Sequence, residues 1–457
     1  MEEKLKIIKY APPPSDLPIY GQVDPKEVCF FGRTNYESEF EIKKYIFGIK
    51  RADRRRHMYI IGKSGVGKTK FLELLLRQDI SYGRGICLMD LHGDIINNIL
   101  DFIPEERIQD VIIIDPSDIN WPASFNPLQN VASEMKHQVT QGLIEVLKKQ
   151  FDANWTPQLE YIFRFICLAL LDYSNATMAG MISILTDRNY RQKVIEHIQD
   201  KTVRRFWEIE FSDWSKKFDT EAIIPLINKL EQFLLNPLLR HIFGQQENKI
   251  DIEKIMNKQK ILLINLSKGK LGEENSSFFG SMLVAKIYQA GIARASIREY
   301  ERKDFYLYVD EFQNVATDTF INILSESRKY GLALTMAHQY RAQLQPQILA
   351  TIMGNVATTV VFRVGGDDAF SMEKEMTPVF KAKDMLNLGV REFYIKMTID
   401  GGVADPFSAE TLKILPPTHS SNREKIIEYS RRTYCAPIEE VKRKIIEEDS
   451  LISGNGI

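Results

Sequence analysis

The sequence predicts an α/β protein in which a mainly parallel sheet is interrupted by an inserted all-helical domain. Two observations predict this class. Short apolar segments of strand length alternate with helix-like segments over residues 58–128 and again over 258–405, which is the pattern of a parallel sheet. Between them, residues 129–257 carry apolar residues at helical spacing. We therefore expect one core in two parts around a helical insertion.

Composition limits the classes of protein to consider. The chain has 457 residues, enough for two or three domains. Its net charge of −1 gives no overall basic character, so contact with nucleic acid would need a local basic surface. The four cysteines are scattered and are expected to be reduced structural thiols.

The amino terminus lacks a signal-peptide core, and no run reaches the roughly 18 apolar residues of a membrane span. We expect a cytoplasmic protein without an integral membrane segment.

Residues 1–57 are expected to form a lead-in to the core. A short strand is predicted at 28–31 and a helix over 39–49. A basic cluster then directly precedes the core and consists of Lys50, Arg51, Arg54, Arg55, Arg56 and His57. The cluster has two interpretations: a solvated turn with an ion-paired rim, or arginines placed near a neighbouring subunit or a phosphate.

The strongest local signal follows this cluster. An apolar segment at 58–61 leads into a glycine-rich loop and then into helix formers at 71–77. The loop matches G-x-x-x-x-G-K-[ST] and consists of Gly62, Lys63, Ser64, Gly65, Val66, Gly67, Lys68 and Thr69. Between a strand and a helix, such a loop cradles phosphates with its backbone N–H groups. Lys68 should reach the β- and γ-phosphates, and the Thr69 hydroxyl should hold Mg²⁺. The core is therefore predicted to be a RecA-like P-loop NTPase.

Two further strands are predicted in the first part of the core, at 85–89 and 111–114, each followed by carboxylates. Open α/β sheets bind ligands beyond the carboxyl ends of their strands. For Asp90 and Asp94, which follow the first of these strands, ordinary turn chemistry and a direct role both remain open.

The insertion carries helical patterns over 158–171 and 221–235. The stretch 204–217 interleaves basic and aromatic residues. Such a stretch could stack on nucleic acid, but the face of a helical bundle is the favoured interpretation.

The second part of the core supplies the complementary half of a nucleotide site. Strands are predicted at 260–265 and 305–309, the latter ending in Asp310 and Glu311. An apolar strand before Asp-Glu is typical of a Walker B element, in which Asp310 would hold the Mg²⁺ shell and Glu311 would deprotonate the attacking water. Thr69 and Asp310 lie 241 positions apart, far more than a few βα units require. The inserted domain accounts for this separation.

Polar residues follow the next strands as well. Gln339 comes after a predicted strand at 333–336 and is a candidate γ-phosphate sensor. Arg328 is either an arginine finger, which would accelerate phosphoryl transfer by about 10³–10⁵, or an ordinary surface arginine. Further strands are expected within 355–366, near Arg363, and at 392–397, before a C-terminal extension over 406–457.

Together these segments resemble the HerA/FtsK superfamily of ring-forming ATPases, and within it the soluble region of type IV secretion (conjugative) coupling proteins. The resemblance covers about residues 45–400. The matching stretches, in chain order, are RRRHMYIIGKSGVGKT, MDLHGD, FNPL, the helical region, ILLINLSKG, FYLYVDEFQNV, SESRKYGLALTMAHQY and NVATTVVFRVGG.

The resemblance implies a homo-hexamer that hydrolyses ATP with Mg²⁺ and moves double-stranded DNA through its channel. A relaxase, a nuclease or a secretion channel would be candidate partners. The implied roles are phosphate and metal binding by Lys68 and Thr69, hydrolysis by Asp310 and Glu311, sensing by Gln339, a finger for the neighbouring subunit from Arg328, and a place at the subunit boundary for Arg363. Membrane-embedded members carry amino-terminal transmembrane helices that this sequence lacks, so the resemblance extends to the motor and not to an anchor.

A second functional class stays open. The chain could be an ATP-regulated assembly or docking protein whose nucleotide state controls the binding of a partner. The net charge of −1 favours this class mildly. Stimulation of ATP hydrolysis by DNA would distinguish the two.

Overall fold

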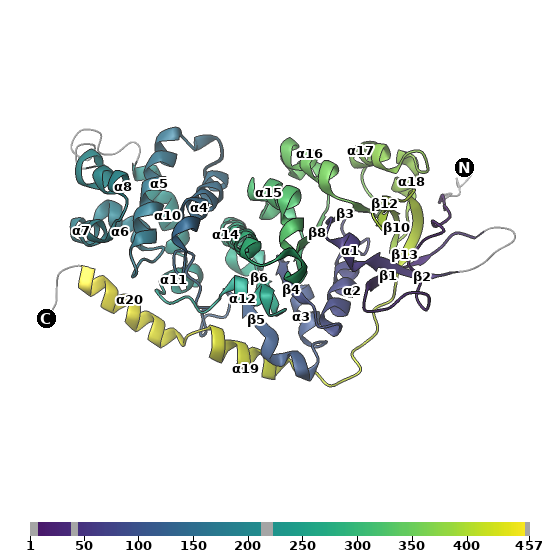
Figure 1. Ribbon diagram of the computed structural model, residues 1–457, viewed down its shortest axis with the longest axis horizontal. Helices are drawn as coiled ribbons and strands as arrows, with labels where there is room; N and C mark the ends of the chain where they lie inside the picture. The colour runs from purple at the N-terminus through teal and green to yellow at the C-terminus, as the bar shows by residue number, and fades with distance from the viewer. Residues whose placement is uncertain (1–7, 38–43, 212–222, 453–457) are drawn as a thin grey trace. The chain divides into compact units, whose positions relative to one another are not determined.

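The computed structural model describes residues 8–37, 44–211 and 223–452 (Figure 1). The chain forms two compact units, each assembled from segments that are distant in sequence. The first consists of Met1–Ile112, Glu253–Ile264 and Gly291–Ile426, and the second of Ile113–Ile252, Asn265–Ala290 and Ile427–Ile457. The expected α/β class is confirmed, because a large, mostly parallel sheet occurs together with a substantial set of helices.

The main sheet has eleven strands within the described part of the chain, in the order β2-β1-β13-β10-β9-β3-β8-β7-β4-β6-β5. The strands are β1 (Val28–Thr34), β2 (Ile46–Lys50), β3 (Met58–Ile61), β4 (Gly85–Asp90), β5 (Val111–Ile114), β6 (Ile261–Asn265), β7 (Phe305–Val309), β8 (Leu332–His338), β9 (Thr358–Val361), β10 (Glu392–Lys396) and β13 (Phe407–Thr411). Two short strands, β11 (Thr398–Ile399) and β12 (Gly402–Val403), pair separately.

The centre of the sheet is parallel. β3 lies between β8 and β9, and β7 and β4 continue the parallel arrangement beyond β8. Every residue of β3, β4, β7 and β8 is buried, as expected for parallel strands covered on both faces. Because the strands run in one direction, their carboxyl ends, and the loops that follow them, meet at one edge.

The helices of the first unit connect and cover these strands. They are α1 (Arg51–Arg54), α2 (Lys68–Ser81), α3 (Asp94–Leu100), α12 (Ile252–Asn257), α15 (Thr319–Glu326), α16 (Pro346–Asn355), α17 (Gly366–Met376) and α18 (Ala382–Asn387). α2 buries Phe71, Leu72 and Leu75 and packs against β1 and β4. This packing fixes the position of α2. The first turn of α2 contains Lys68 and Thr69, the last two residues of the glycine-rich loop.

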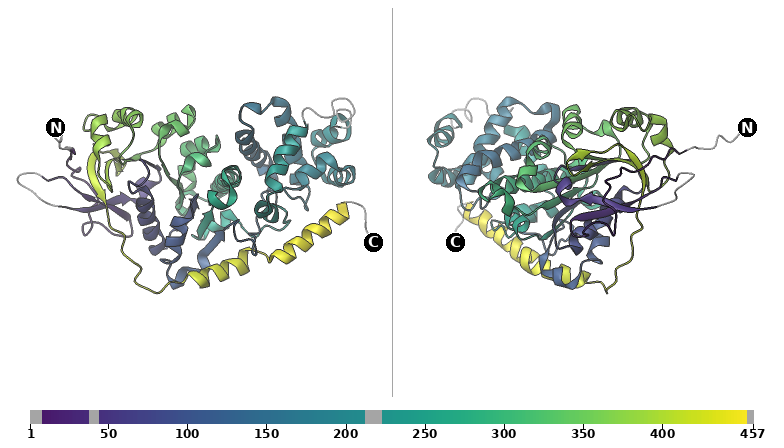
Figure 2. Two further views of the ribbon diagram at one scale, coloured as in Figure 1. Left: turned by 180° about the vertical axis from the view of Figure 1, so that it is seen from behind. Right: turned by 45° about the vertical axis from the view of Figure 1, so that its right-hand side comes forward.

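The second unit is built mainly from helices. They are α4 (Lys136–Phe151), α5 (Pro157–Asp172), α6 (Gly180–Thr186), α7 (Arg188–His197), α8 (Lys201–Arg205), α10 (Ile223–Leu234), α11 (Pro237–Phe243), α13 (Lys268–Leu271), most of α14 (Glu273–Ala293), the end of α19 (Arg423–Tyr434), and α20 (Ile438–Ile452). Figure 2 shows α4 to α8 gathered side by side, and α5 contacts α4, α6, α7 and α8. Thr156 caps α5, and Asp187 and Asp200 cap α7 and α8, so ordinary N-cap chemistry starts three of these helices.

The aromatic and basic stretch at 204–217 is partly described. Phe206 and Trp207 are 0% and 2% exposed, so their rings belong to the interior of the helical unit and cannot stack on an external base. This supports the favoured interpretation as a bundle face. Trp214, Lys216 and Lys217 lie outside the described residues.

The helix expected over 39–49 is wrong where the structure describes it. Residues 46–50 form β2, which pairs antiparallel with β1, and Phe47 and Ile49 are fully buried. The aromatic and β-branched side chains Phe47, Ile46 and Ile49 favour a strand, and pairing with β1 decides the outcome. Residues 39–43 lie outside the described part.

Among the described helices, none is both long and apolar enough to cross a lipid bilayer. The four cysteines are all buried with free thiols.

Candidate active site

The glycine-rich loop leaves the sheet at the end of its sixth strand in order, β3. Gly62 is required for packing, since a Cβ there would lie 2.6 Å from the Cβ of Phe362. Gly65 and Gly67 have φ values of 76° and 117°, which residues with a Cβ rarely adopt. The three glycines therefore shape a loop that turns tightly from β3 into α2, as a phosphate-binding loop requires.

Lys68 is the first residue of α2, and its ammonium group points back into the loop. Nζ donates to the carbonyl oxygens of Gly62 (2.6 Å) and Lys63 (3.1 Å). Burial lowers the pKa of Lys68, while the nearby carboxylates of Glu311 and Asp310 oppose this shift. Thr69 follows and is half-buried. The loop, Lys68 and Thr69 thus form one face of a polar site.

Asp310 and Glu311 form the opposite face, at the end of β7. Asp310 is 4% exposed, and burial together with the charges of Glu311 and Asp90 raises its pKa to about 7, with Lys68 acting in the opposite direction. The carboxylate accepts from the backbone N–H of Glu311 at 3.0 Å. The structure therefore brings the two halves of the predicted site together across 241 positions of sequence.

Two amide side chains hold the carboxylate of Glu311. Gln339, just after β8, donates to Oε1 at 2.9 Å. Gln313, two residues after Glu311, donates to Oε2 at 2.7 Å. Gln339 thus lies beside the predicted base, and Gln313 is a member of the site that sequence reasoning did not single out.

The acidic residues after β4 differ from each other. The Asp90 carboxylate accepts four backbone N–H groups, those of His92, Gly93, Ile95 and Ile96, at 2.8–3.1 Å. Asp94 is exposed on the first turn of α3. Asp90 therefore shapes the start of α3, which is the turn chemistry that the sequence left open, and its charge still reaches Asp310.

Two arginines border the loop from the other side. Arg363 follows β9, and its carbonyl oxygen accepts from the Lys63 N–H at 2.9 Å. The Arg391 N–H donates to the Val66 carbonyl at 2.9 Å, and the Arg391 Cα lies 3.6 Å from where a Cβ of Gly67 would stand. Arg391 is more than 300 positions from the loop, so no local pattern indicates it.

Arg328 does not join this site. It is exposed on a 3₁₀ turn, Ser327–Tyr330, that precedes β8, whereas the glycine-rich loop follows β3, which is parallel to β8. The seven residues of β8 separate the two ends of the sheet by roughly 20 Å. Arg328 therefore cannot contact a phosphate held by its own loop.

Arg328 instead lines a cavity of about 490 Å³ at the amino ends of the parallel strands. The lining includes further cations, Arg56 and Lys396, and the carboxylate of Glu375. Arg56 also donates to the Gly401 carbonyl at 3.3 Å, and Lys396 lies 3.8 Å from Glu375. One face of the unit thus presents more positive than negative side chains around Arg328.

The rest of the basic cluster before β3 is structural. Arg51 and Arg54 are 3% and 2% exposed and both bind the buried carboxylate of Asp79, at 2.5 and 2.8 Å. Arg55 pairs with Asp304 at 2.7 Å. Within the cluster, Arg51 and Arg54 are therefore buried structural cations, whereas Arg55 belongs to an ion-paired rim.

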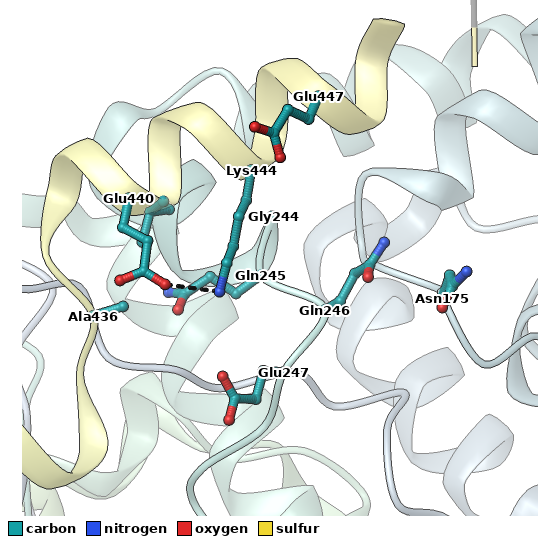
Figure 3. A pocket seen from close by; sticks show the side chains of 10 residues that line it. Asn175, Gly244, Gln245, Gln246, Glu247, Ala436, Glu440, Lys444 and Glu447 are labelled. Atoms are coloured by element: carbon teal, nitrogen blue, oxygen red, sulfur yellow. Dashed lines mark ion pairs between the residues drawn. The ribbon is translucent and has the colours of Figure 1, made fainter. Parts of the chain in front are cut away.

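A second cavity, of about 380 Å³, lies in the helical unit beneath α20 (Figure 3). Its wall carries Gln245, Gln246 and Glu247 on one side and Glu440 and Lys444 of α20 on the other. Lys444 and Glu440 form an ion pair at 2.9 Å. The cavity has none of the features of the glycine-rich site.

Comparisons with known proteins agree with this geometry. A family model described as the type IV secretion-system coupling protein DNA-binding domain matches residues 46–376. The search of curated proteins gave no match.

Several solved structures share the fold. The unbound bacterial conjugative coupling protein TrwBdeltaN70 is 15% identical, with a TM-score of 0.58 over 82% of this chain and 88% of that one. The plasmid coupling protein TrwB in complex with ADP and Mg²⁺ is 16% identical, with a TM-score of 0.57 over 83% and 90%. VirB4 of Thermoanaerobacter pseudethanolicus is 13% identical, with a TM-score of 0.54 over 78% and 89%. At these identities the likeness is one of fold, and membership rests on the family model. The chain therefore belongs to the family of the type IV secretion-system coupling protein DNA-binding domain.

Proposed function

We propose that the protein is a ring-forming ATPase that hydrolyses ATP with Mg²⁺ and uses the energy to translocate or process double-stranded DNA, as a coupling protein would. The observation that carries the proposal is the meeting of Lys68, Asp310 and Glu311 around the glycine-rich loop. Family membership and the solved complex of TrwB with ADP and Mg²⁺, a protein of the same fold, support it.

The loop and Lys68 would bind the phosphates of ATP. The loop ends at the start of α2, where the backbone N–H groups and the helix dipole favour anions. Lys68 now donates to two loop carbonyls, and the β- and γ-phosphate oxygens are stronger acceptors for an ammonium group. We infer that Lys68 exchanges these carbonyls for phosphate when ATP binds.

Thr69 and Asp310 would hold Mg²⁺. The donor set is a hydroxyl and a carboxylate, the hard oxygen ligands that Mg²⁺ prefers. Burial is the main cause of the raised pKa of Asp310, about 7, and the negative charges of Glu311 and Asp90 add to it. A divalent cation would offset those charges. When bound, Mg²⁺ would neutralise the charge that develops on the phosphate oxygens.

Glu311 would act as the general base, with Gln339 as the sensor of the γ-phosphate. Gln339 bonds Glu311 at 2.9 Å and stands at the tip of β8, the parallel neighbour of β3. A single side chain therefore connects the predicted base with the edge at which the phosphates would lie. Arg363, whose carbonyl already supports Lys63, would contribute a positive charge near the same edge.

Arg328 would be supplied to the neighbouring subunit. It lies at the far end of the strands from its own loop, so a role as a finger requires another copy of the chain. The nearby cations Arg56 and Lys396 support an anionic partner at this face. A closed ring, with a hexamer as the family norm, satisfies this requirement for every subunit.

The DNA would be received or supplied by a partner protein. A relaxase, a nuclease or a secretion channel would be that partner.

Replacement of the base tests the proposal. Glu311→Gln should still bind ATP but lose turnover, because the amide cannot take a proton from water while the loop remains intact. Removal of a general base costs roughly 10²–10⁴ in rate. ATP affinity from a fluorescent analogue and steady-state phosphate release should be measured on the same preparation. Wild-type turnover in this variant would contradict the assignment of Glu311.

A further inference from the structure

The side-chain amide of Gln313 makes a specific contact with the carboxylate of Glu311, just after β7. Its Nε2 donates to Glu311 Oε2 at 2.7 Å, while Gln339 occupies Oε1 at 2.9 Å. Because a carboxylate only accepts hydrogen bonds, each amide must present its NH₂ group to Glu311. This fixes the orientation of the Gln313 amide, and its oxygen lies on the same carbon as the nitrogen that bonds Glu311.

The backbone around Glu311 is shaped to make this contact. Glu311 has φ 50° and ψ 47°, a left-handed conformation that is uncommon for a residue with a side chain and often found at functional sites. The 3₁₀ turn Phe312–Asn314 follows at once. Phe312 is fully buried, and Asn314 Nδ2 donates to the Glu311 carbonyl at 2.8 Å. The turn brings Gln313, rather than a more distant residue, back onto the carboxylate.

The amide oxygen of Gln313 is buried and has no hydrogen-bond partner among the described residues. Buried polar atoms are nearly always satisfied, and exceptions call for an explanation. This acceptor stands next to the Glu311 carboxylate. A water molecule at that position would donate one hydrogen to Glu311 and the other to Gln313, which leaves a lone pair of its oxygen free to attack.

We propose that Gln313 is a positioning residue for hydrolysis, which fixes the Glu311 carboxylate through Nε2 and orients the attacking water through Oε1. This inference rests on the proposed role of Glu311 as the base. In the step, the water oxygen forms a bond to the γ-phosphorus and the bond from that phosphorus to the bridging oxygen breaks. Its electron pair leaves with ADP, and Glu311 takes one proton of the water.

Two substitutions test whether the amide of Gln313 acts in hydrolysis. Gln313→Met keeps the length of the side chain but removes both donor and acceptor. Gln313→Glu keeps an acceptor but replaces the donor with a negative charge that repels Glu311. Loss of a hydrogen bond to a charged group corresponds to about 10- to 100-fold in rate. We expect kcat to fall by this factor in Gln313→Met and by at least as much in Gln313→Glu, with the KM for ATP and ATP affinity unchanged.

Asn314→Ala provides the matched control. It removes a hydrogen bond to Glu311 from the neighbouring residue of the same turn, but to the backbone carbonyl and not to the carboxylate. We expect its kcat to fall by less than that of Gln313→Met, because it disturbs the turn but leaves both hydrogen-bonding groups of the Gln313 amide in place. An equal fall of kcat in Asn314→Ala and Gln313→Met would overturn the proposal, because disturbance of the turn would then explain both.

The outcomes also distinguish this inference from the proposed function. If Glu311→Gln is inactive while Gln313→Met and Gln313→Glu turn over at the wild-type rate, the role of Gln313 is refuted and the base assignment stands. If KM and ATP affinity worsen while kcat is kept, Gln313 serves binding, which also refutes the inference. Wild-type turnover in Glu311→Gln would instead refute the assignment of Glu311 as the base, on which this inference rests.

Discussion

His57, the residue directly before β3, is a buried side chain that makes the stability of the folded protein depend on pH. It is 1% exposed with φ 66°, and its Nδ1 accepts from the Leu334 N–H at 3.1 Å. Burial lowers the pKa of His57 to about 4, from an ordinary value of 6.5. The folded protein therefore holds this ring neutral at pH values at which the unfolded chain would protonate it.

This shift predicts a loss of stability in acid. Between pH 6.5 and about 4 the unfolded chain binds a proton that folded His57 does not, so stability is fully present above pH 6.5 and falls as the pH falls through this window. His57→Asn should weaken the dependence, since an Asn side chain can accept from Leu334 and tolerates a positive φ. The melting temperatures of both proteins at pH 5 and pH 7.5 measure it.

A second histidine limits the expected effect. Burial also lowers the pKa of His338, to about 3, so His57→Asn should retain part of the slope. An unchanged difference in melting temperature between the two pH values would contradict the assignment to His57.

At the scale of elements, a buried cluster of charged side chains connects α2, the helix that follows the glycine-rich loop, with β7, the strand that ends at Asp310. Asp79 near the end of α2 is fully buried and accepts from Arg51 and Arg54 of α1 and from the Tyr308 hydroxyl of β7, at 2.5–2.8 Å. Arg54 also lies over the Tyr306 ring, 4.0 Å from its centroid. Although burial opposes it, the charges of Arg54 and Arg51 lower the pKa of Asp79.

Removal of this carboxylate should destabilise the first unit severely. Asp79→Asn would leave two buried guanidinium groups without their counter-ion, and breaking a buried pair in this way costs about 3–5 kcal/mol. Thermal unfolding should show a clear fall in melting temperature. Glu105→Gln, the same chemical change at an exposed pair with Lys425, is the control and should leave the melting temperature unchanged. Equal effects in the two variants would count against the account of the cluster.

The sequence predicted most elements of the core because their signals are local. The apolar runs that became β3, β4, β7 and β8 are buried along their whole length, and α5 (Pro157–Asp172) matches the helix expected over 158–171. The helix over 39–49 was wrong because pairing with β1, which is a tertiary contact, decided the conformation of β2.

Within the site, local motifs predicted the loop and the Asp-Glu pair but not what surrounds them. Arg391 reaches the loop from a distant turn, and the partners of Asp79 come from three elements. Gln313 could have been found, since it lies two residues after Glu311; what the sequence lacks is the left-handed turn that directs its side chain to the carboxylate.

At the scale of the whole molecule, the two ends of the parallel sheet carry different chemistry. The carboxyl ends hold the glycine-rich loop, Asp310 and Glu311, and the amino ends hold Arg328 with Arg56 and Lys396. A single chain cannot join the two ends across roughly 20 Å of strand. If Arg328 is a finger, the working unit is a ring.

Mixed rings test that requirement. Arg328→Ala subunits keep an intact loop and Lys68→Ala subunits keep an intact Arg328, and each protein alone should be inactive. In mixtures, some interfaces pair a functional loop with a functional arginine, so ATP hydrolysis should reappear and peak near equal proportions. No recovery at any ratio would refute a finger supplied in trans.

The central claim is that ATP hydrolysis by a ring is coupled to DNA. The most direct measurement is the steady-state ATPase rate of the full chain with and without duplex DNA, with oligomer mass measured on the same samples. We predict a ring-sized mass, a rate that rises with DNA, and a stimulation that falls steeply as salt increases, because a motor that grips several phosphates releases counter-ions on binding. An identical rate with and without DNA at low salt would contradict the claim and favour an ATP-regulated assembly protein.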